Sequence, residues 1–232
     1  MRRMLLIGVL FAGCASASSD AGPGATDADP GSGTVDAELA LIDGAPDAPP
    51  DAYVPQPITI TQSTSPAMVS GNTLVCGQAP YTLENHYYRV FPLADHGIAG
   101  EFQVQNVQFG VEHAQGSHTL TVNVGTYSGA VTPTTAGLDA ALWTPIASTS
   151  IGIPDGDQQT INVPIAATIP AGGKLMVELA SPNSSDRFWP SSNASGETYP
   201  TYRRTTCANT IQSYAATGIT TVHLVMNVSG LR

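Results

Sequence analysis

Three titratable side chains surround one predicted turn and could act together. Glu112 and His113 precede the turn residues Ala114–Ser117, and His118 follows them, so a hairpin would bring the three near one another. Zinc needs three or four converging ligands, and general-base chemistry needs a histidine oriented by a partner. A solvated turn needs neither and is the favoured interpretation. We expect no metal here, and only clustering of the three with a further carboxylate would indicate an unrecognised secreted hydrolase.

Two other groups of polar residues have an equally simple structural explanation. Asp155 and Asp157 flank Gly156 and could help to hold Ca²⁺, but Asp-Gly is first of all a hairpin-turn sequence. His223 lies on the strand face opposite the predicted core row, which favours a structural hydrogen-bonding role. No nucleophile elbow, zinc-binding helix, phosphate loop or dinucleotide fingerprint is present in the sequence, so we expect no enzyme activity and no cofactor.

The stretch Asp186–Ala208 is the most suggestive of ligand binding. It combines aromatic rings with amide and guanidinium donors, which sugar- and peptide-binding surfaces use for stacking and for orientation. The alternative is a long loop whose aromatic side chains pack over one sheet. The candidate binding residues are Arg187, Trp189, Asn193, Tyr199, Tyr202 and Arg203.

The first residues have the pattern of an export signal. Arg2 and Arg3 precede an apolar run, Met4–Phe11, that is far shorter than the roughly 20 residues needed to cross a bilayer. We therefore expect residues 1–13 to be a cleaved signal peptide. The following residues, Phe11–Cys14, resemble the lipobox of bacterial lipoproteins.

That resemblance implies lipidation of Cys14 and a membrane anchor at the mature N-terminus. Ala15 stands where an Asp would signal inner-membrane retention, which favours the outer membrane, with the protein facing the periplasm or the cell surface. The alternative is an ordinary secretory signal with a bystander cysteine.

Residues 14–55 have the composition of a disordered tether. Residues 15–55 hold seven Asp, one Glu and six Pro but no Lys or Arg, and such a segment buries too little apolar surface to order itself. The Asp-Ala-Pro composition resembles the tethers of myxobacterial lipoproteins. Calcium capture by these Asp residues is the less favoured alternative. The net charge of −10 excludes a nucleic-acid partner, because no basic stripe is available to contact phosphates.

Two further cysteines, Cys76 and Cys207, lie in polar sequence outside the apolar runs. If Cys14 carries lipid, they remain as an even pair in an oxidising compartment, and a disulfide is the natural interpretation. A metal-binding or catalytic thiol is less favoured, because there is no Cys-x-x-Cys spacing.

Residues 56–232 alternate apolar and polar side chains with the period of β-strands. The clearest runs are Thr119–Tyr127, Thr160–Ile165, Lys174–Leu179 and Thr221–Gly230. Within Glu101–Ala114 the apolar phase slips by one residue, which predicts a β-bulge near Gln105–Asn106. The pattern predicts an all-β domain: an antiparallel, jelly-roll-like β-sandwich of about eight or nine strands.

The domain also resembles a β-sandwich module found towards the C-terminus of secreted bacterial proteins and lipoproteins. The resemblance covers much of residues 80–230, through the stretches Glu84–Leu93, Phe102–Ala114, Val163–Leu179, Ser192–Cys207 and His223–Gly230. It implies an accessory, adhesive or structural role, with a glycan or an envelope protein as partner, and it implies no catalytic residues.

Overall fold

The computed structural model describes residues 54–78 and 81–232, and the signal peptide and most of the predicted tether lie outside them. The described chain is all-β and antiparallel, as predicted, and its first strand begins at Pro57. Its helical segments are short 3₁₀ turns: η1 (Leu93–His96), η2 (Ala140–Leu142) and η3 (Ala215–Thr217). In this part of the chain no helix is long and apolar enough to cross a bilayer.

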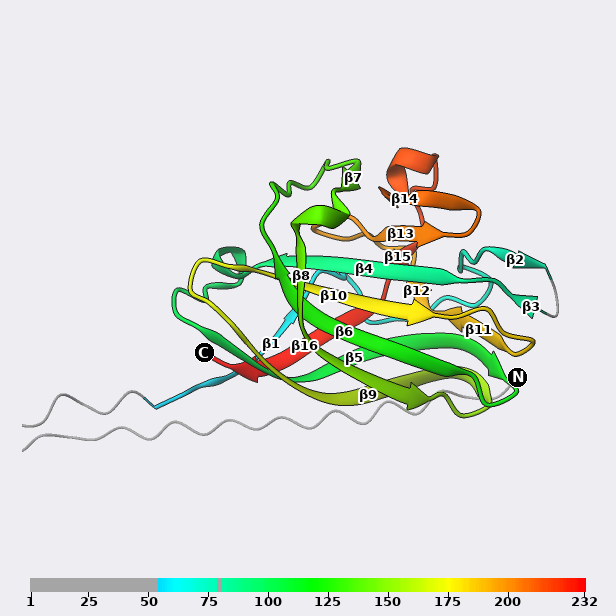
Figure 1. The fold of residues 1–232 in the computed structure, drawn as a ribbon, viewed down its shortest axis with the longest axis horizontal. Coiled ribbons are helices and arrows are strands. Elements are labelled where there is room, and N and C mark those ends of the chain that lie inside the picture. The colour runs from blue at the N-terminus through cyan, green and yellow to red at the C-terminus, as the bar shows by residue number, and fades with distance from the viewer. Residues whose placement is uncertain (1–53, 79–80) are drawn as a thin grey trace, which may run out of the picture. The chain divides into compact units, whose positions relative to one another are not determined.

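Two sheets form the domain (Figure 1). The five-stranded sheet contains β1 (Pro57–Thr61), β16 (Met226–Leu231), β5 (Phe102–Gln115), β11 (Arg187–Pro190) and β9 (Gly156–Ile169). The seven-stranded sheet has the order β7 (Gly137–Leu138), β14 (Ala208–Ser213), β13 (Tyr202–Thr205), β4 (Asn85–Pro92), β10 (Lys174–Ser181), β6 (Thr119–Tyr127), β8 (Trp143–Gly152).

Two small ladders complete the described strands, and the chain connects the sheets in a jelly-roll-like way. The ladders pair β2 (Gly77–Gln78) with β3 (Tyr81–Thr82) and β12 (Ser192–Asn193) with β15 (His223–Leu224). The described strands outnumber the expected eight or nine because seven of them have four residues or fewer, too few to show a period. The chain crosses between the two large sheets repeatedly, for example from β4 to β5 and back to β6.

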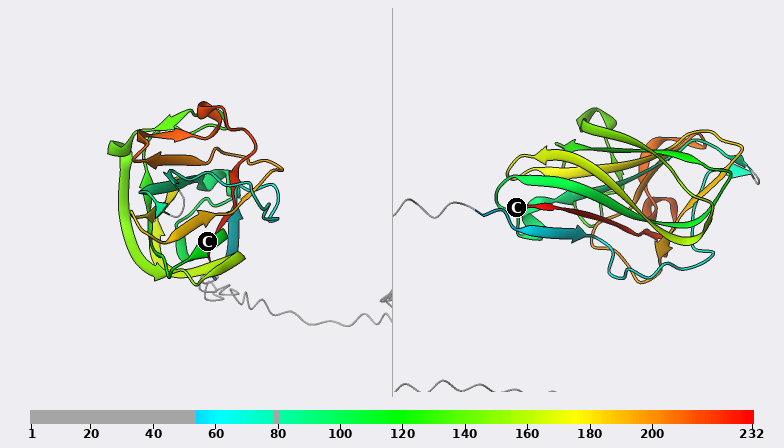
Figure 2. Two further views of the ribbon diagram at one scale, coloured as in Figure 1. Left: turned by 90° about the vertical axis from the view of Figure 1, so that its right-hand side faces the viewer. Right: turned by 90° about the horizontal axis from the view of Figure 1, so that it is seen from below.

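The core lies between the two sheets, which face each other (Figure 2). Alternation along each strand places its apolar side chains inside. Leu120, Val122 and Val124 of β6 are fully buried there, in one cluster with Val107 and Phe109 of β5. The period-two pattern therefore predicted the buried face of these strands correctly.

Strand β5 contains the predicted bulge. Its pairing with β9 shifts register between Val104 and Asn106, so the apolar row returns to the core after the slip in the sequence. The ladder between β5 and β16 shifts at the same level, between Ser229 and Gly230. A Cβ on Gly230 would stand 2.2 Å from the carbonyl oxygen of Gln103, so the close approach of the strands requires glycine there.

The outer face of the seven-stranded sheet is covered over only part of its area. A second apolar cluster contains Tyr88, Val90 and Met176 from the central strands, together with Tyr127, Leu138, Tyr202 and Ile211. Trp143 packs against it. Towards the other end of the same face, β4, β10 and β6 carry polar side chains instead, and these form the candidate site described below.

The predicted disulfide is confirmed: Cys76 is bonded to Cys207, with a Cα–Cα distance of 6.1 Å. Beside it, Asn85 bridges the start of β4 to Cys76, accepting the backbone N–H of Cys76 at 2.7 Å and donating to its carbonyl oxygen at 2.9 Å. The backbone N–H of Thr206 donates to the carbonyl oxygen of Glu84 at 3.3 Å. The disulfide thus ties the turn between β13 and β14 to the segment that enters β4.

Candidate functional site

The six candidate residues of the 187–204 stretch do not form one surface. Arg187 and Trp189 lie on β11 of the five-stranded sheet, whereas Tyr202 and Arg203 lie on β13 of the seven-stranded sheet. The chain crosses between the sheets within this stretch. Neighbours in sequence are therefore separated in space, and alternate residues of a strand point to opposite faces.

Arg187 and Trp189 do contact each other. The Arg187 guanidinium carbon is 5.8 Å from the centre of the Trp189 ring, and the His113 ring centre is 5.3 Å from that ring. His113 also pairs through Nδ1 with the exposed carboxylate of Asp157. Both Arg187 and Trp189 are half-buried. These neighbours pack against the indole, so this patch offers a ligand less free ring surface than the sequence suggested.

The other candidate residues serve the fold where the structure places them. Asn193 is buried, and its Oδ1 accepts the backbone N–H groups of Ser195 and Gly196 at 2.9 and 3.0 Å. The Tyr199 hydroxyl donates to Asp95. The remaining two are Tyr202, which is fully buried in the second apolar cluster, and Arg203, whose guanidinium carbon is 5.6 Å from the Tyr214 ring centre.

The residues around the Ala114–Ser117 turn point to different places. Glu112 lies beside a second register shift of β5 and accepts the backbone N–H of Gly71 at 2.9 Å. His118 is buried, stacked on Phe188 with ring centres 5.3 Å apart. Asp155 accepts the backbone N–H groups of the turn at 2.8 and 3.0 Å, so it stabilises the hairpin. Residues 54–78 and 81–232 contain no group of three His, Cys, Asp or Glu side chains placed to hold a metal.

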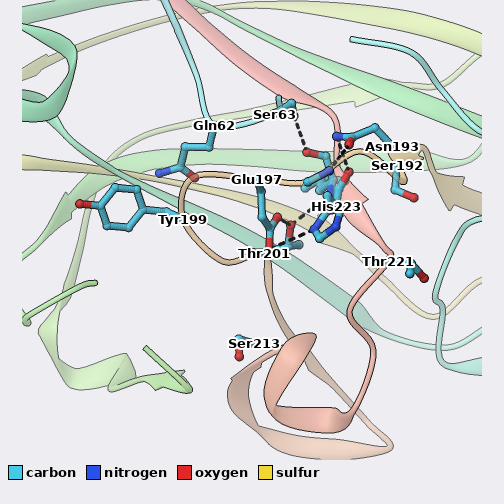
Figure 3. A network of polar contacts seen from close by, with 12 residues as sticks. Gln62, Ser63, Ser192, Asn193, Glu197, Tyr199, Thr201, Ser213, Thr221 and His223 are labelled. Carbon is cyan, nitrogen blue, oxygen red and sulfur yellow. Dashed lines mark hydrogen bonds and ion pairs between the residues drawn. The ribbon is translucent and has the colours of Figure 1, made fainter. Parts of the chain in front are cut away.

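A buried ion pair holds the loop after β12 against the core, and Figure 3 shows its carboxylate, Glu197, beside Thr201 and His223. Arg89 lies on the inner face of β4, is fully buried, and its Nη1 is 2.9 Å from Oε2 of Glu197. It also donates to the carbonyl oxygens of Tyr199, at 2.8 Å, and Leu224. Burial lowers the pKa of Arg89, and the neighbouring Glu197 carboxylate partly offsets this by favouring the charged form.

Two further side chains complete this network. Thr201 donates to Oε2 of Glu197 at 2.6 Å, and Nδ1 of His223 lies 3.4 Å from Oε1 of the same carboxylate. Since most of these contacts fix backbone or buried charge, the network is a structural element, and His223 joins it through the 3.4 Å contact with Glu197, with no hydrogen bond from Nδ1 to the described residues.

A polar cluster on the outer face of the seven-stranded sheet is the best-defined candidate site, and the sequence analysis did not identify it. His86 of β4 stands between two carboxylates, with Nδ1 2.8 Å from Glu178 and Nε2 2.5 Å from Glu84. Arg204 of β13 reaches Nε2 of His86 at 3.0 Å and is 3.8 Å from Glu84. Asn123 of β6 donates to the other oxygen of Glu178 at 2.7 Å.

The surroundings of this cluster favour its charged forms. Burial lowers the pKa of His86, but the hydrogen bonds to Glu178 and Glu84 outweigh it, so the pKa lies above its ordinary value. Burial raises the pKa of Glu178, and its bonds to His86, Tyr88 and Asn123 more than reverse this, so that pKa is lowered. An imidazole that donates to both carboxylates is protonated at both nitrogens, in the direction of the raised pKa, and Arg204 then meets Nε2 as a like charge that lowers this pKa and not as a hydrogen-bond donor.

A cavity opens beside the cluster, with a volume of about 420 Å³. Glu84, His86, Thr121, Ala180, Ser181, Pro182 and Asn183 line it. This volume lies within the roughly 300–1,000 Å³ that is typical of small-molecule sites. Alternation in Glu84–Tyr88 does place Glu84, His86 and Tyr88 on one face, but their partners Glu178 and Arg204 come from other strands far along the chain. Pairing of the strands is what assembles the site.

The comparisons with known proteins leave the family open. No protein-family model matches the chain, and no curated protein matches it. Among solved structures, a match is the crystal structure of the cysteine protease and lectin-like domains of Cwp84, a surface layer associated protein of Clostridium difficile, at 14% identity and a TM-score of 0.41. The match covers 65% of this chain and 32% of that one, so this chain spans about a third of its length. A likeness of this size carries no functional argument.

Proposed function

We propose that this chain is a lipid-anchored protein of the bacterial outer membrane whose β-sandwich, displayed on the acidic segment of residues 14–55, has an adhesive or accessory role and is not an enzyme. The observation that carries the proposal is the Cys76–Cys207 disulfide. Structural disulfides persist in oxidising compartments, which supports a location outside the cytoplasm. Because these two cysteines bond each other, Cys14 has no partner within the chain and is available for acylation.

A non-catalytic role is supported by how the polar side chains of the described domain are used. Glu197 neutralises a buried arginine, Asp155 stabilises a turn, and His118 is packed in the core. Glu112 and His113 have separate partners, the backbone of Gly71 and the carboxylate of Asp157.

Metabolic labelling with an alkyne fatty acid tests the anchor. The full chain is expected to take up label, Cys14→Ser to lose it, and Cys76→Ser/Cys207→Ser to keep it as the matched control. Mass spectrometry of the mature N-terminus should find an acylated Cys14. An unlabelled parent chain, or a mature N-terminus elsewhere, would refute the anchor. If the parent chain is labelled, protease shaving of intact cells distinguishes periplasmic from surface exposure.

A further inference from the structure

The cavity beside Glu84 is lined by both apolar and polar side chains. Ala180 and Pro182 provide the apolar surface, and Glu84, Thr121 and Asn183 provide the polar groups. A mainly apolar pocket with a few convergent polar groups is the usual form of a small-ligand site. The Glu84 side chain is 39% exposed, so its carboxylate is reachable from solvent although it is held in place.

The charges around the cavity select the class of ligand. Glu84, which lines the cavity, is an acceptor, and Arg204, which lies outside the lining 3.8 Å from Glu84 and is 38% exposed, is a donor. An ammonium group placed on Glu84 would be repelled by Arg204, and a carboxylate or phosphate placed on Arg204 would be repelled by Glu84. A pair of neighbouring hydroxyls suits both, because each hydroxyl donates and accepts a hydrogen bond.

Two uncharged side chains add to the polar groups that line the cavity. The Thr121 hydroxyl shares a hydrogen bond with that of Ser150 at 3.1 Å, and a hydroxyl engaged in this way can still form one more hydrogen bond with a ligand. Asn183 uses Oδ1 to accept the backbone N–H of Glu84 at 2.7 Å, so the donor of that side chain is its Nδ2. A neutral sugar ring matches this mixed lining, because its hydroxyls both donate and accept and its C–H groups suit the apolar side chains.

The site is held rigid before any ligand arrives. His86 fixes Glu84 from one side and is itself fixed by Glu178. Arg204 donates through Nε to the hydroxyl of Tyr88 at 3.3 Å, and the backbone of Glu84 is tied to the turn that contains the disulfide. Side chains positioned by strands and by a second layer of hydrogen bonds need little reordering on binding.

We propose that this cavity binds one neutral sugar residue of a glycan. The Glu84 carboxylate accepts a hydrogen bond from one hydroxyl of the sugar, and Arg204 donates one to the adjacent hydroxyl. Thr121 and Asn183 contact the sugar ring from the cavity wall. The inference deepens the adhesive role proposed above and rests on it for the compartment in which a glycan would be met. The binding itself depends only on the geometry of the cavity.

The test begins with the full chain carrying Cys14→Ser, applied to an array of neutral, amino-sugar and acidic glycans. Titration calorimetry with the selected saccharide then compares the parent with Glu84→Gln and Thr121→Val, which change charge or hydrogen bonding while keeping side-chain size. Each should weaken binding about tenfold or more. Glu101→Gln is the matched control, because Glu101 is an exposed carboxylate beside a different cavity of about 470 Å³, and it should leave binding unchanged.

Several outcomes would overturn the proposal. These are an array with no neutral glycan bound, equal affinity in the parent, Glu84→Gln and Thr121→Val, or loss of binding in Trp189→Ala while both cavity variants bind normally. Thermal melting of each variant confirms folding, and Thr121→Val keeps the test valid if Glu84→Gln fails to fold. Fatty-acid labelling of Cys14 is scored separately, so a failed anchor and a failed glycan site give different results.

Discussion

Replacing Glu197 with Gln leaves the fully buried Arg89 without its counter-charge and is expected to destabilise the domain strongly. The substitution keeps the size of the side chain but replaces one of its two accepting oxygens with a donor, so the loss combines missing charge compensation with one missing acceptor for Thr201 or Arg89. Removing one partner of a buried ion pair typically costs about 3–5 kcal/mol. For a domain of this size that corresponds to a decrease of about 6–20 °C in Tm.

The companion substitution Arg89→Met removes the buried charge but leaves the carbonyl oxygens of Tyr199 and Leu224 without their donor. Because the two single changes damage the same ion pair, their effects should not add. We expect the double variant to lose less stability than the sum of the single losses, by about 1–3 kcal/mol.

Urea denaturation of the full chain carrying Cys14→Ser, followed by near-UV circular dichroism, measures each free energy of unfolding. Glu101→Gln removes an exposed carboxylate and should change stability by no more than about 0.5 kcal/mol. A loss below about 1 kcal/mol in Glu197→Gln, or losses that add within about 0.5 kcal/mol in the double variant, would refute the assignment of Glu197 as the compensating charge.

Three further predictions follow from the fold. Replacing Cys76 and Cys207 with Ala should cost about 5 kcal/mol on the loop-entropy model, since the bond spans 131 residues; urea midpoints unaffected by the replacement would contradict this. The raised pKa of His86 means that its ion pairs stabilise the fold fully below its ordinary value of 6.5 and that this stability is lost as the pH rises through the raised pKa. His86→Gln should therefore flatten the pH dependence of the urea midpoint at pH values above 6.5, and identical profiles for parent and variant would exclude the role. Gly230→Ala should destabilise by about 1–3 kcal/mol or more because its Cβ meets a carbonyl of β5, whereas Gly152→Ala, with open space around its Cβ, should be nearly neutral in the same assay.

The strand pattern was readable from the sequence because burial on one face leaves a period of two. The buried row of Leu120, Val122 and Val124 and the bulge after Val104 both follow from that rule alone. The disulfide could be expected from cysteine parity and compartment. Very short strands could not be predicted, because a period needs several residues to appear.

The polar sites were harder to predict because they depend on which strands become neighbours. Arg89 stands in the core row of β4 between Tyr87 and Phe91, and only its distant partner Glu197 explains an arginine there. The role of His86 likewise depends on its contacts with Glu178 and with Arg204 of β13, which the sequence alone does not place beside it. The opposite error affected the 187–204 stretch, where closeness in sequence was taken for closeness in space although the chain crosses from one sheet to the other.

The pairing of the first strand with the last has a mechanical consequence. Strand β1 is an edge strand bonded only to β16, and the backbone of Gln56 also pairs with that of Arg232. A pull on the chain from its N-terminal side therefore loads these hydrogen bonds first. Detaching β1 withdraws Ile60 from the core but leaves β16, β5 and β9 paired.

The disulfide then limits how far such a pull can proceed. From Val54 to Cys76 the freed chain would extend by roughly 75 Å at full length. At that point the covalent bond to Cys207 transfers the load directly to the seven-stranded sheet. The fold thus combines an edge strand that can detach under load with a covalent bond that limits how far the chain extends.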